Sequence, residues 1–203
     1  MSGQPAPADL LDFWFGVLDD GFADPAHRRS WFDGGSTMDA RVRERFAGLP
    51  DAAAAGGLDH WLDSPRGRLA WIIVCDQLPR HLHRGNPAAF AFDAGALAAA
   101  RAGIAAGVDR VLGFDERAFF YLPFEHAESI LDQHTAVGLF TALRDATPSG
   151  RRHLTGAWLR HAAQHRDLIL RFGRFPYRNA ALGRNSTAAE LDYLTSGSAG
   201  SQS

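Results

Sequence analysis

Three stretches of the sequence set ionisable side chains among apolar residues, and chemistry is expected there first. The first stretch is CDQLPRHLHRG, residues 75–85. On a helix, Asp76, Arg80 and His83 recur at spacings of four and three residues, so they share one face. The structural alternative is a simple Asp–Arg pair, with cationic residues at a helix end where the helix dipole favours them. Pro79 has no backbone N–H and is expected to kink this helix.

The second stretch is DERAFFYLPFEHAESILDQ, residues 115–133. Glu125, His126 and Glu128 follow Pro123 and are expected in the first turn of a helix. Acids in that position are favoured by the helix dipole, which is a structural reason for both glutamates. His126 has no such reason, and carboxylates on both sides would raise its pKa. His126 is therefore a candidate general acid or base, with Glu128 as its partner.

The third stretch is RHAAQHRDLILRFGRFPYRN, residues 160–179, and it contains a histidine pair. His161 and His165 are four residues apart, as two metal ligands on one helix would be. The glutamate of the zincin motif is absent, and a metal would need Asp76, Glu128 or Asp132 to lie nearby. A histidine on an apolar helix face is more often a hydrogen-bonded packing residue. We therefore predict no metal, and we keep His165 as a second candidate acid or base.

The same stretch ends in a turn that carries arginines between aromatic residues. Gly173 is the expected C-cap of the preceding helix, and Pro176 prevents the helix from continuing. The guanidinium groups of Arg174 and Arg178 could meet buried acids or an external anion. Alternating arginines and aromatic residues can also bind single-stranded nucleic acid. Because this patch is short and the net charge of the chain is −2, no nucleic-acid partner is predicted.

The composition limits the classes of function. All 21 basic residues are arginine, and the lack of lysine excludes Schiff-base and pyridoxal-phosphate enzymes and the P-loop. We expect no cofactor. The single cysteine, Cys75, lies in the longest apolar run, LAWIIVC, which is far shorter than the roughly 20 residues of a membrane span. A buried inert thiol, a cytoplasmic location and no membrane partner are expected.

The elements that position these residues are predicted to be helices. Apolar residues recur at helical spacing, and no segment alternates with the period of two that a sheet requires. A length of 203 residues with 46% hydrophobic residues fits one domain, residues 1–203, ordered over about 8–194 and flexible at 1–7 and 195–203. Antiparallel helix pairs in a bundle or a solenoid are expected. The predicted helices are 8–18, 37–47, 51–62, 65–82, 93–106, 115–122, 125–146, 151–172 and 187–194, with Trp31 and Phe32 in a loop.

Several motifs resemble a known family. These are FWFG at residues 13–16, CDQLPRHLHRG followed by PAAFAFDAGAL, ERAFFYLPFEHAE, and HRDLILRFGRFPYRN followed by LGR, ST and E. In this order, from Leu10 to Leu194, they resemble the bacterial domain of unknown function 924 family. The resemblance implies an all-α, tetratricopeptide-like right-handed superhelix in the cytoplasm, and it implies no particular activity. Tyr177 stands where the family pattern favours histidine.

The residues at which the chain matches the family pattern are mostly polar and lie in the three stretches. Buried ionisable groups are costly unless they are paired, so such clusters mark a site more often than a core, although an internal ion-pair network is the alternative. The leading hypothesis is a pocket for a small anionic molecule or an acidic peptide end. Its predicted ligand-binding residues are Asp76, Arg80, Glu116, Arg117, Arg174, Arg178 and Asn179, and its other polar residues are His126, Glu128 and His165.

Two other functions stay open from the sequence. One is a metal-independent enzyme in which His126 or His165 is the general acid or base, tuned by Glu128 or Glu125, with the arginines stabilising an oxyanion. The other is a protein-interaction scaffold that uses a concave helical face. A pocket or an active site predicts that the three stretches converge, which Arg80, His126 and Arg174 would show, whereas a scaffold predicts a wide exposed groove.

Overall fold

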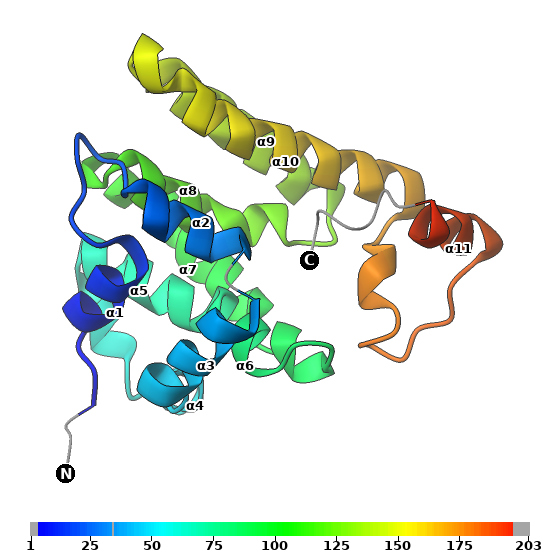
Figure 1. Ribbon diagram of the computed structural model, residues 1–203, viewed down its shortest axis with the longest axis horizontal. Helices are drawn as coiled ribbons and strands as arrows, with labels where there is room; N and C mark the ends of the chain where they lie inside the picture. The colour runs from blue at the N-terminus through cyan, green and yellow to red at the C-terminus, as the bar shows by residue number, and fades with distance from the viewer. Residues whose placement is uncertain (1–3, 34, 197–203) are drawn as a thin grey trace.

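The computed structural model describes residues 4–33 and 35–196. Short 3-10 helices connect the α-helices: η1 Asp59–Asp63, η2 Pro87–Phe90, η3 Val108–Val111, η4 Ser149–Arg151 and η5 Pro176–Arg178. Of the ends predicted to be flexible, residues 1–3 and 197–203 lie outside the described part. The α-helices (Figure 1) are α1 Pro7–Phe15, α2 Pro25–Asp33, α3 Gly35–Phe46, α4 Leu49–Ala54, α5 Pro65–Asp76, α6 Leu78–Leu82, α7 Asp93–Ala105, α8 Phe114–Glu125, α9 Ile130–Ala146, α10 Arg152–Phe172 and α11 Ala188–Thr195.

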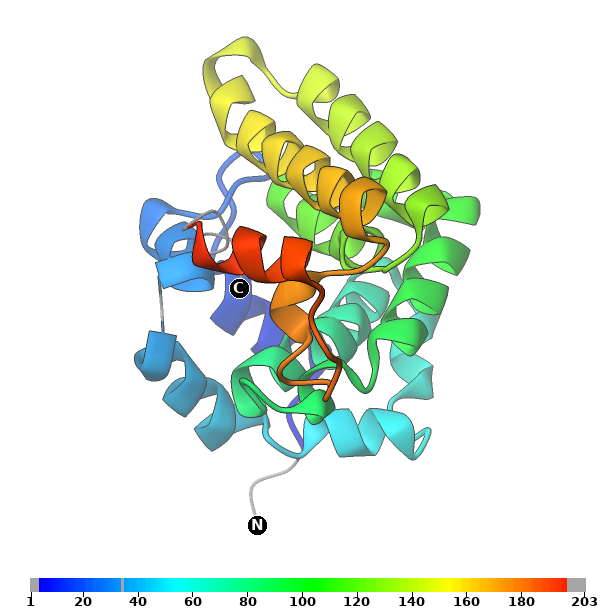
Figure 2. The same cartoon turned by 90° about the vertical axis from the view of Figure 1, so that its right-hand side faces the viewer.

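Helix α5 lies in the middle of the molecule and packs against α1, α7 and α8. The long helices α9 and α10 lie side by side and cover α8, as both Figure 1 and Figure 2 show. The short α11 follows the end of α10, and the segment between them returns toward α6 and η2 (Figure 2). Helix α5 can be central because residues 69–70 and 72–75 are buried and lie around its whole circumference, as expected for a helix that is apolar on every side.

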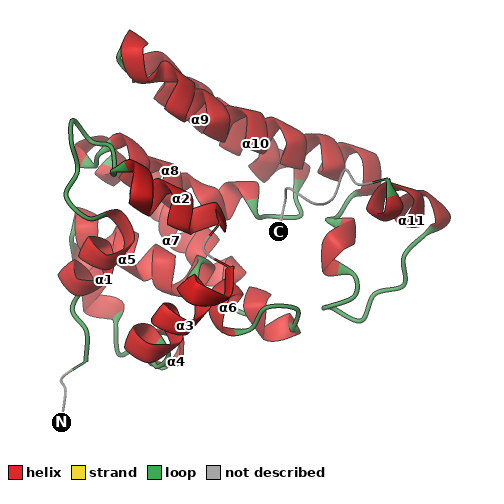
Figure 3. Cartoon of the chain, in the orientation of Figure 1, coloured by secondary structure: helices red, strands yellow, loops and turns green. Residues whose placement is uncertain are grey.

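The prediction of an all-α fold is confirmed. The described residues form no β-strand (Figure 3), and only an isolated bridge joins Asp19 and Phe22. Local signals begin several helices as the sequence indicates. The Ser64 hydroxyl accepts a hydrogen bond from the backbone N–H of Gly67, 3.1 Å away, at the start of α5, and Thr187 and Glu190 form the capping box of α11. Gly173 ends α10 with a φ of 71°, the left-handed conformation expected of a C-cap glycine.

The prediction of a loop around Trp31 is wrong, because α2 covers residues 25–33. The carboxylate of Asp24 accepts hydrogen bonds from the backbone N–H groups of Ala26 (2.7 Å) and His27 (3.0 Å). Asp24 followed by Pro25 is thus an N-cap followed by proline at the first helical position. This local signal was sufficient to predict the helix.

The predicted boundary at Pro123 is also wrong. Helix α8 continues through Pro123 to Glu125, with His126 as its C-cap, and α9 starts only after Ser129. A proline in the last turn removes one backbone hydrogen bond, and burial of the surrounding aromatic helix outweighs that loss. Glu125 therefore lies at the negative end of a helix dipole, the opposite of the position assumed for it in the sequence.

The aromatic part of the core is centred on Phe119. Its ring contacts those of Trp14, Phe15, Trp31 and Trp158 edge-on, with centroid separations of 4.8 to 5.7 Å. These partners come from α1, α2 and α10, so one side chain of α8 joins elements that are far apart in the sequence. Edge-to-face pairs of this kind contribute about 0.5–1.5 kcal/mol beyond the area that they bury.

Cys75 lies near the C-terminal end of α5, with 2% of its surface exposed. Burial, followed by the charge of the neighbouring Asp76, raises the pKa of the thiol to about 12. The thiol is therefore protonated at neutral pH and unreactive while the protein is folded.

The segment Pro87–Ala105 is long and apolar enough to cross a membrane by length and composition alone. It consists of two helices, η2 and α7, separated by two residues. Asp93 is ion-paired to Arg80, Arg101 is ion-paired to Asp132, and α7 packs against α5 and α8. One face of α7, formed by Ala96, Ala99, Ala100 and Gly103, is buried in this packing.

Replacing Gly67 by alanine is expected to lower the free energy of unfolding by about 2 kcal/mol. A Cβ at Gly67 would lie 2.3 Å from the carbonyl oxygen of Trp61 and 2.7 Å from the hydroxyl of Ser64, so the backbone at the start of α5 must move. Urea unfolding measures the change. Gly138→Ala is the control, because a Cβ there meets nothing within 4 Å, and alanine in an open helical position stabilises by about 0.5–1 kcal/mol. Equal effects of the two changes would contradict this account.

Candidate functional site

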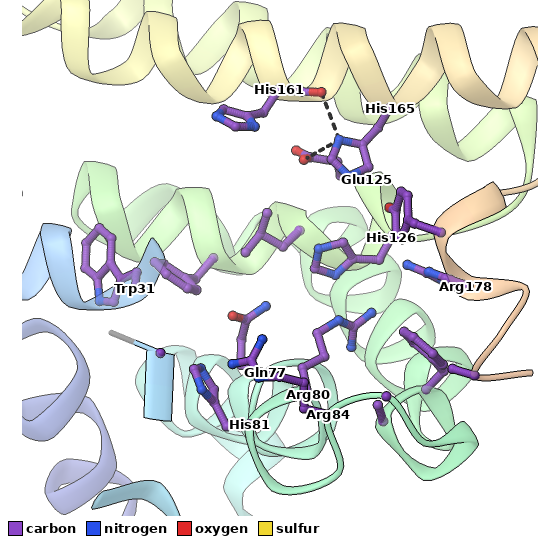
Figure 4. Close-up of a pocket in the computed structure, with 18 of the residues that line it drawn as sticks. Trp31, Gln77, Arg80, His81, Arg84, Glu125, His126, His161, His165 and Arg178 are labelled. Atoms are coloured by element: carbon purple, nitrogen blue, oxygen red, sulfur yellow. Dashed lines mark hydrogen bonds and ion pairs between the residues drawn. The ribbon is translucent and has the colours of Figure 1, made fainter. Parts of the chain in front are cut away.

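A cavity of about 440 Å³ lies between α6, the end of α8, α10 and the turn η5. Figure 4 shows it from one side, with His161 and His165 above it on α10, Arg80 and Gln77 below it, and Arg178 reaching in from the C-terminal segment. Its aromatic lining residues are Trp31, Phe90, Phe119, Trp158 and Tyr177, and its polar ones are Gln77, Arg80, His81, Arg84, Glu125, His126, His161, His165 and Arg178.

Arg80 is held by a carboxylate that follows it in the sequence. Its two terminal nitrogens donate to the two oxygens of Asp93, at 2.8 and 2.9 Å. Nη1 also donates to the backbone carbonyl of Asp76 and lies 3.5 Å from the carboxylate of Asp76. The break between α5 and α6 at Gln77 gives Arg80 this position. Although burial opposes its charge, the two aspartates raise the pKa of Arg80 above its ordinary value.

Arg178 lies on the opposite wall and is less completely paired. Only 6% of its side chain is exposed, and its guanidinium lies over the rings of Phe90 and Phe175, with centroid distances of 4.7 and 4.6 Å. Its nearest carboxylate oxygen is that of Asp93, 3.5 Å from Nη1, and that aspartate is already bound by Arg80. The Nε–H of Arg178 is buried without a hydrogen-bond partner. Burial is the largest influence and lowers the pKa of Arg178 with help from the repulsion of Arg80, although Tyr177 acts in the opposite direction.

His126 is oriented by a fully buried aspartate. Its Nδ1 lies 2.8 Å from Oδ1 of Asp76, and Gln77 donates to the other oxygen of Asp76 at 2.6 Å. Burial alone would raise the pKa of Asp76, but the charges of Arg80 and His126 and these hydrogen bonds hold it well below its usual range. Because Asp76 stays ionised, Nδ1 of His126 carries the proton, and Nε2 is left as a hydrogen-bond acceptor. Burial lowers the pKa of His126.

His165 and Glu125 form a second pair beside the first. Nδ1 of His165 donates to the backbone carbonyl of His161 at 3.0 Å and lies 3.1 Å from Oε1 of Glu125. Burial raises the pKa of Glu125 to about 8, with a further contribution from Asp76, and burial lowers the pKa of His165 to about 3. At neutral pH both groups are uncharged, so their contact is not a salt bridge between charged groups. The rings of His165 and His126 are 6.4 Å apart.

The wall of the cavity near α3 carries another histidine, His81. Nδ1 of His81 lies 2.7 Å from Asp39, which also accepts two hydrogen bonds from Arg84, at 2.9 and 3.1 Å. Burial lowers the pKa of His81. The charges of Arg84 and Asp39 neutralise each other, so together they add no net charge to this wall of the cavity.

The other predicted site residues lie outside the cavity lining. Arg174 is paired with Glu190 at 2.7 and 2.9 Å, and Asn179 donates to Ser186 at 3.0 Å. Glu128 binds Arg184 at 2.7 and 2.9 Å. The structure therefore brings Arg80, His126, His165 and Arg178 together around the cavity, with Asp76 behind them, and places Arg174 in a separate ion pair.

Glu116 and Arg117 occupy positions at the start of α8. Glu116 accepts a hydrogen bond from the backbone N–H of Gly113 at 2.8 Å and is paired with Arg66 at 3.2 Å. Arg117 donates to the hydroxyl of Tyr121 at 3.1 Å. Glu116 caps the start of the helix, Arg117 contacts a residue one turn further along, and neither lines the cavity. Within residues 4–33 and 35–196, no group of three or more histidine, cysteine, aspartate or glutamate side chains is arranged to hold a metal ion.

Several cavity residues had no signal in the sequence. Trp31 and Phe119 follow ordinary apolar patterns, and Phe90 is part of a connecting segment. Gln77 and His81 lie within the first stretch but off the predicted face of Asp76 and Arg80. Asp93, which binds Arg80, starts a helix that looks purely structural. These residues come together at the cavity only through the tertiary packing of the chain.

Comparisons with known proteins show the family of the chain. A family model described as a bacterial protein of unknown function (DUF924) matches residues 10–198. The solved structure of a protein of unknown function from Agrobacterium tumefaciens has 37% sequence identity and a TM-score of 0.78, and the alignment covers 94% of this chain and 97% of that one. No curated protein matches. The chain therefore belongs to the DUF924 family of bacterial proteins of unknown function.

Proposed function

We propose that the cavity binds a small molecule that carries a carboxylate or phosphate group on an apolar or aromatic body. The observation that supports this most strongly is Arg178, a buried guanidinium that lines the cavity and is short of partners. The same chemistry would receive the carboxylate of an acidic peptide end.

Among the arginines of residues 171–184, Arg178 differs from Arg174 and Arg184 in its ion pairing. Arg174 has Glu190, and Arg184 has Glu128. Arg178 shares Asp93 at 3.5 Å and is hydrogen-bonded to the hydroxyl of Tyr177, and its Nε–H has no partner. A buried charge is costly unless its partners are complete, and an external anion that accepted from the guanidinium would remove that cost.

The charges around Arg178 suit a ligand with one anionic group. Asp76 and Asp93 lie beside Arg80, which is bound to both. The imidazoles have lowered pKa values and are neutral at pH 7, and the raised pKa of Glu125 keeps that carboxyl protonated. A second anionic group on the ligand would approach two aspartates without a further unpaired cation to meet it.

The walls and size of the cavity indicate the rest of the ligand. A volume of about 440 Å³ is in the range of small-molecule sites, which are mostly apolar with a few polar groups that fix orientation. Phe90, Phe119 and Trp158 supply the apolar surface, and Gln77 is a neutral polar group among them. We therefore expect an aromatic or aliphatic acid, or a phosphate ester of similar size.

Isothermal titration calorimetry with phenyl phosphate and phenylacetate tests this proposal. Arg178→Met is expected to weaken the binding of whichever probe binds wild type by tenfold or more, because a charge-assisted hydrogen bond contributes about 1.5–3 kcal/mol. Arg171→Met is the control, since Arg171 is exposed at the end of α10 and lies over Phe172. Thermal unfolding of each variant verifies that it is folded, and Arg178→Lys, which keeps the charge, should bind with intermediate affinity. Binding that is unaffected by Arg178→Met would contradict the proposal.

A further inference from the structure

We propose that the cavity is a proton-transfer centre in which Nε2 of His126 removes a proton from a C–H bond of the bound molecule, with Asp76 as the residue that positions the imidazole. This inference rests on the proposed function, because the substrate would be the anionic molecule in the cavity. It adds a reaction to the proposed binding, and it gives the buried Asp76 the role of orienting His126.

The geometry is that of an oriented base. Asp76 accepts from Nδ1 of His126 at 2.8 Å, and Gln77 holds the second carboxylate oxygen at 2.6 Å. The aspartate is 1% exposed, whereas His126 lines the cavity. A buried carboxylate that fixes one ring nitrogen selects the tautomer, directs the other nitrogen and stabilises the imidazolium that forms after proton transfer.

The surroundings of His126 keep it in the basic form. The charged groups that face it are Asp76 from α5, Arg80 from α6 and Arg178 from η5, and the ring of His165 lies on its α10 side. Burial is the largest influence, and the lowered pKa means that the imidazole is neutral at pH 7. A base that is already deprotonated near neutral pH can accept a proton without prior ionisation.

The reaction needs no atoms or electrons beyond those of the substrate and His126. The C–H bond breaks, its proton goes to Nε2, and its electron pair moves into a neighbouring carbonyl or similar electron-withdrawing group. Where that group is the substrate's own carboxylate, the negative charge develops on the group that the guanidinium of Arg178 already binds, and Arg178 stabilises it. Return of the proton to another carbon gives an isomerisation, and departure of a leaving group with its electron pair gives an elimination. Glu125, whose pKa of about 8 keeps it protonated at pH 7, is a proton donor on the same wall.

An uncharged carbon acid can test the base without knowledge of the natural substrate. In 5-nitrobenzisoxazole a base removes the ring C–H proton, the electron pair completes a nitrile and the N–O bond breaks to release a coloured phenolate. The compound is aromatic, so it matches the walls of the cavity, and it does not need Arg178 for its initial binding. Failure of anion binding and failure of proton transfer are thereby distinguishable.

Wild type is expected to convert this probe with saturation kinetics, and His126→Gln is expected to lower kcat/KM at least tenfold. The control is His153→Gln, an exposed histidine of α10 that lies outside the cavity lining. Added imidazole should restore turnover in His126→Gly. The wild-type rate should rise with pH through a pKa below 6.5 and then level off, because the base is His126 in its neutral form.

The variant Asp76→Asn tests whether Asp76 orients His126 or only fills space beside it. It is expected to lower kcat more than it raises KM and to alter the pH profile, since an amide does not stabilise the imidazolium as a carboxylate does. Equal turnover by wild type and His126→Gln, or a rate that increases linearly with hydroxide, would overturn the proposal while leaving the binding of phenyl phosphate unaffected. Loss of turnover in His153→Gln would also overturn it.

Discussion

Replacing Phe119 by alanine is expected to lower the free energy of unfolding by about 4 kcal/mol. Phe119 is 2% exposed and its ring contacts four other aromatic rings. Truncation of a buried phenylalanine costs about 3–5 kcal/mol, because apolar burial is lost and a void remains. Since the ring also lines the cavity, the surrounding residues cannot close the void without narrowing the candidate site.

Urea unfolding measures this change, with Phe172→Ala as the control. Phe172 is partly buried in the smaller cluster around Leu168, Ile169, Phe175 and Tyr193, and its truncation should cost less than half as much. Phe119→Leu, which keeps more of the buried volume, should fall between wild type and alanine. A loss below about 1.5 kcal/mol for Phe119→Ala would mean that the rings around it repack freely.

Replacing Glu125 by glutamine is expected to stabilise the protein increasingly as the pH rises. The pKa of Glu125 is about 8 in the folded protein, against an ordinary value of 4.5. Between these two values the unfolded chain has lost the proton and the folded protein has kept it. The wild type therefore loses about 1.4 kcal/mol of stability per pH unit through this group. Glutamine keeps the shape of the side chain beside His165 and has no proton to lose.

The measurement is the difference in unfolding free energy between Glu125→Gln and wild type at about pH 5.5 and about pH 7.5. Two pH units correspond to a change of about 2.7 kcal/mol in favour of the variant. The lowered pKa of His165 makes both proteins less stable as the pH falls below 6.5, so this effect cancels in the difference.

Glu128→Gln is the matched control, because Arg184 lowers the pKa of that carboxyl against the effect of burial. Its contribution is complete above the ordinary pKa and is lost as the pH falls below it, so no slope is expected between these two pH values. A flat difference for Glu125→Gln would mean that Glu125 is ionised and forms a true salt bridge with His165.

Much of the fold could be predicted because its signals are local. The spacing of apolar residues, Ser64 before Pro65 and the pair Thr187–Glu190 each act within one helix. One error missed a local signal, and the other came from tertiary packing. Asp24 before Pro25 is an N-cap that was sufficient to place α2, and Pro123 does not end α8 because the burial of that helix outweighs one lost hydrogen bond.

The candidate site could be predicted only in part. The sequence shows which side chains are costly to bury, and Arg80, His126, His165 and Arg178 do line one cavity. It does not show which acid each arginine meets, because that depends on distances across the folded chain. Arg174 finds Glu190, Arg184 finds Glu128 and Arg80 finds Asp93, so the arginine with incomplete pairing emerges only when the other pairs are known.

The single cysteine gives the protein a built-in reporter of its own opening. Cys75 is adjacent to the aspartate that orients His126, and its thiol is both covered and protonated in the native state. A thiol-specific reagent can therefore react only from molecules in which the end of α5 has transiently separated from its neighbours. The rate of modification under native conditions, compared with that of the unfolded chain, measures the free energy of this opening. Bound ligand should slow the modification if it stabilises the joint between α5 and α6 on which Arg80 and Asp76 depend.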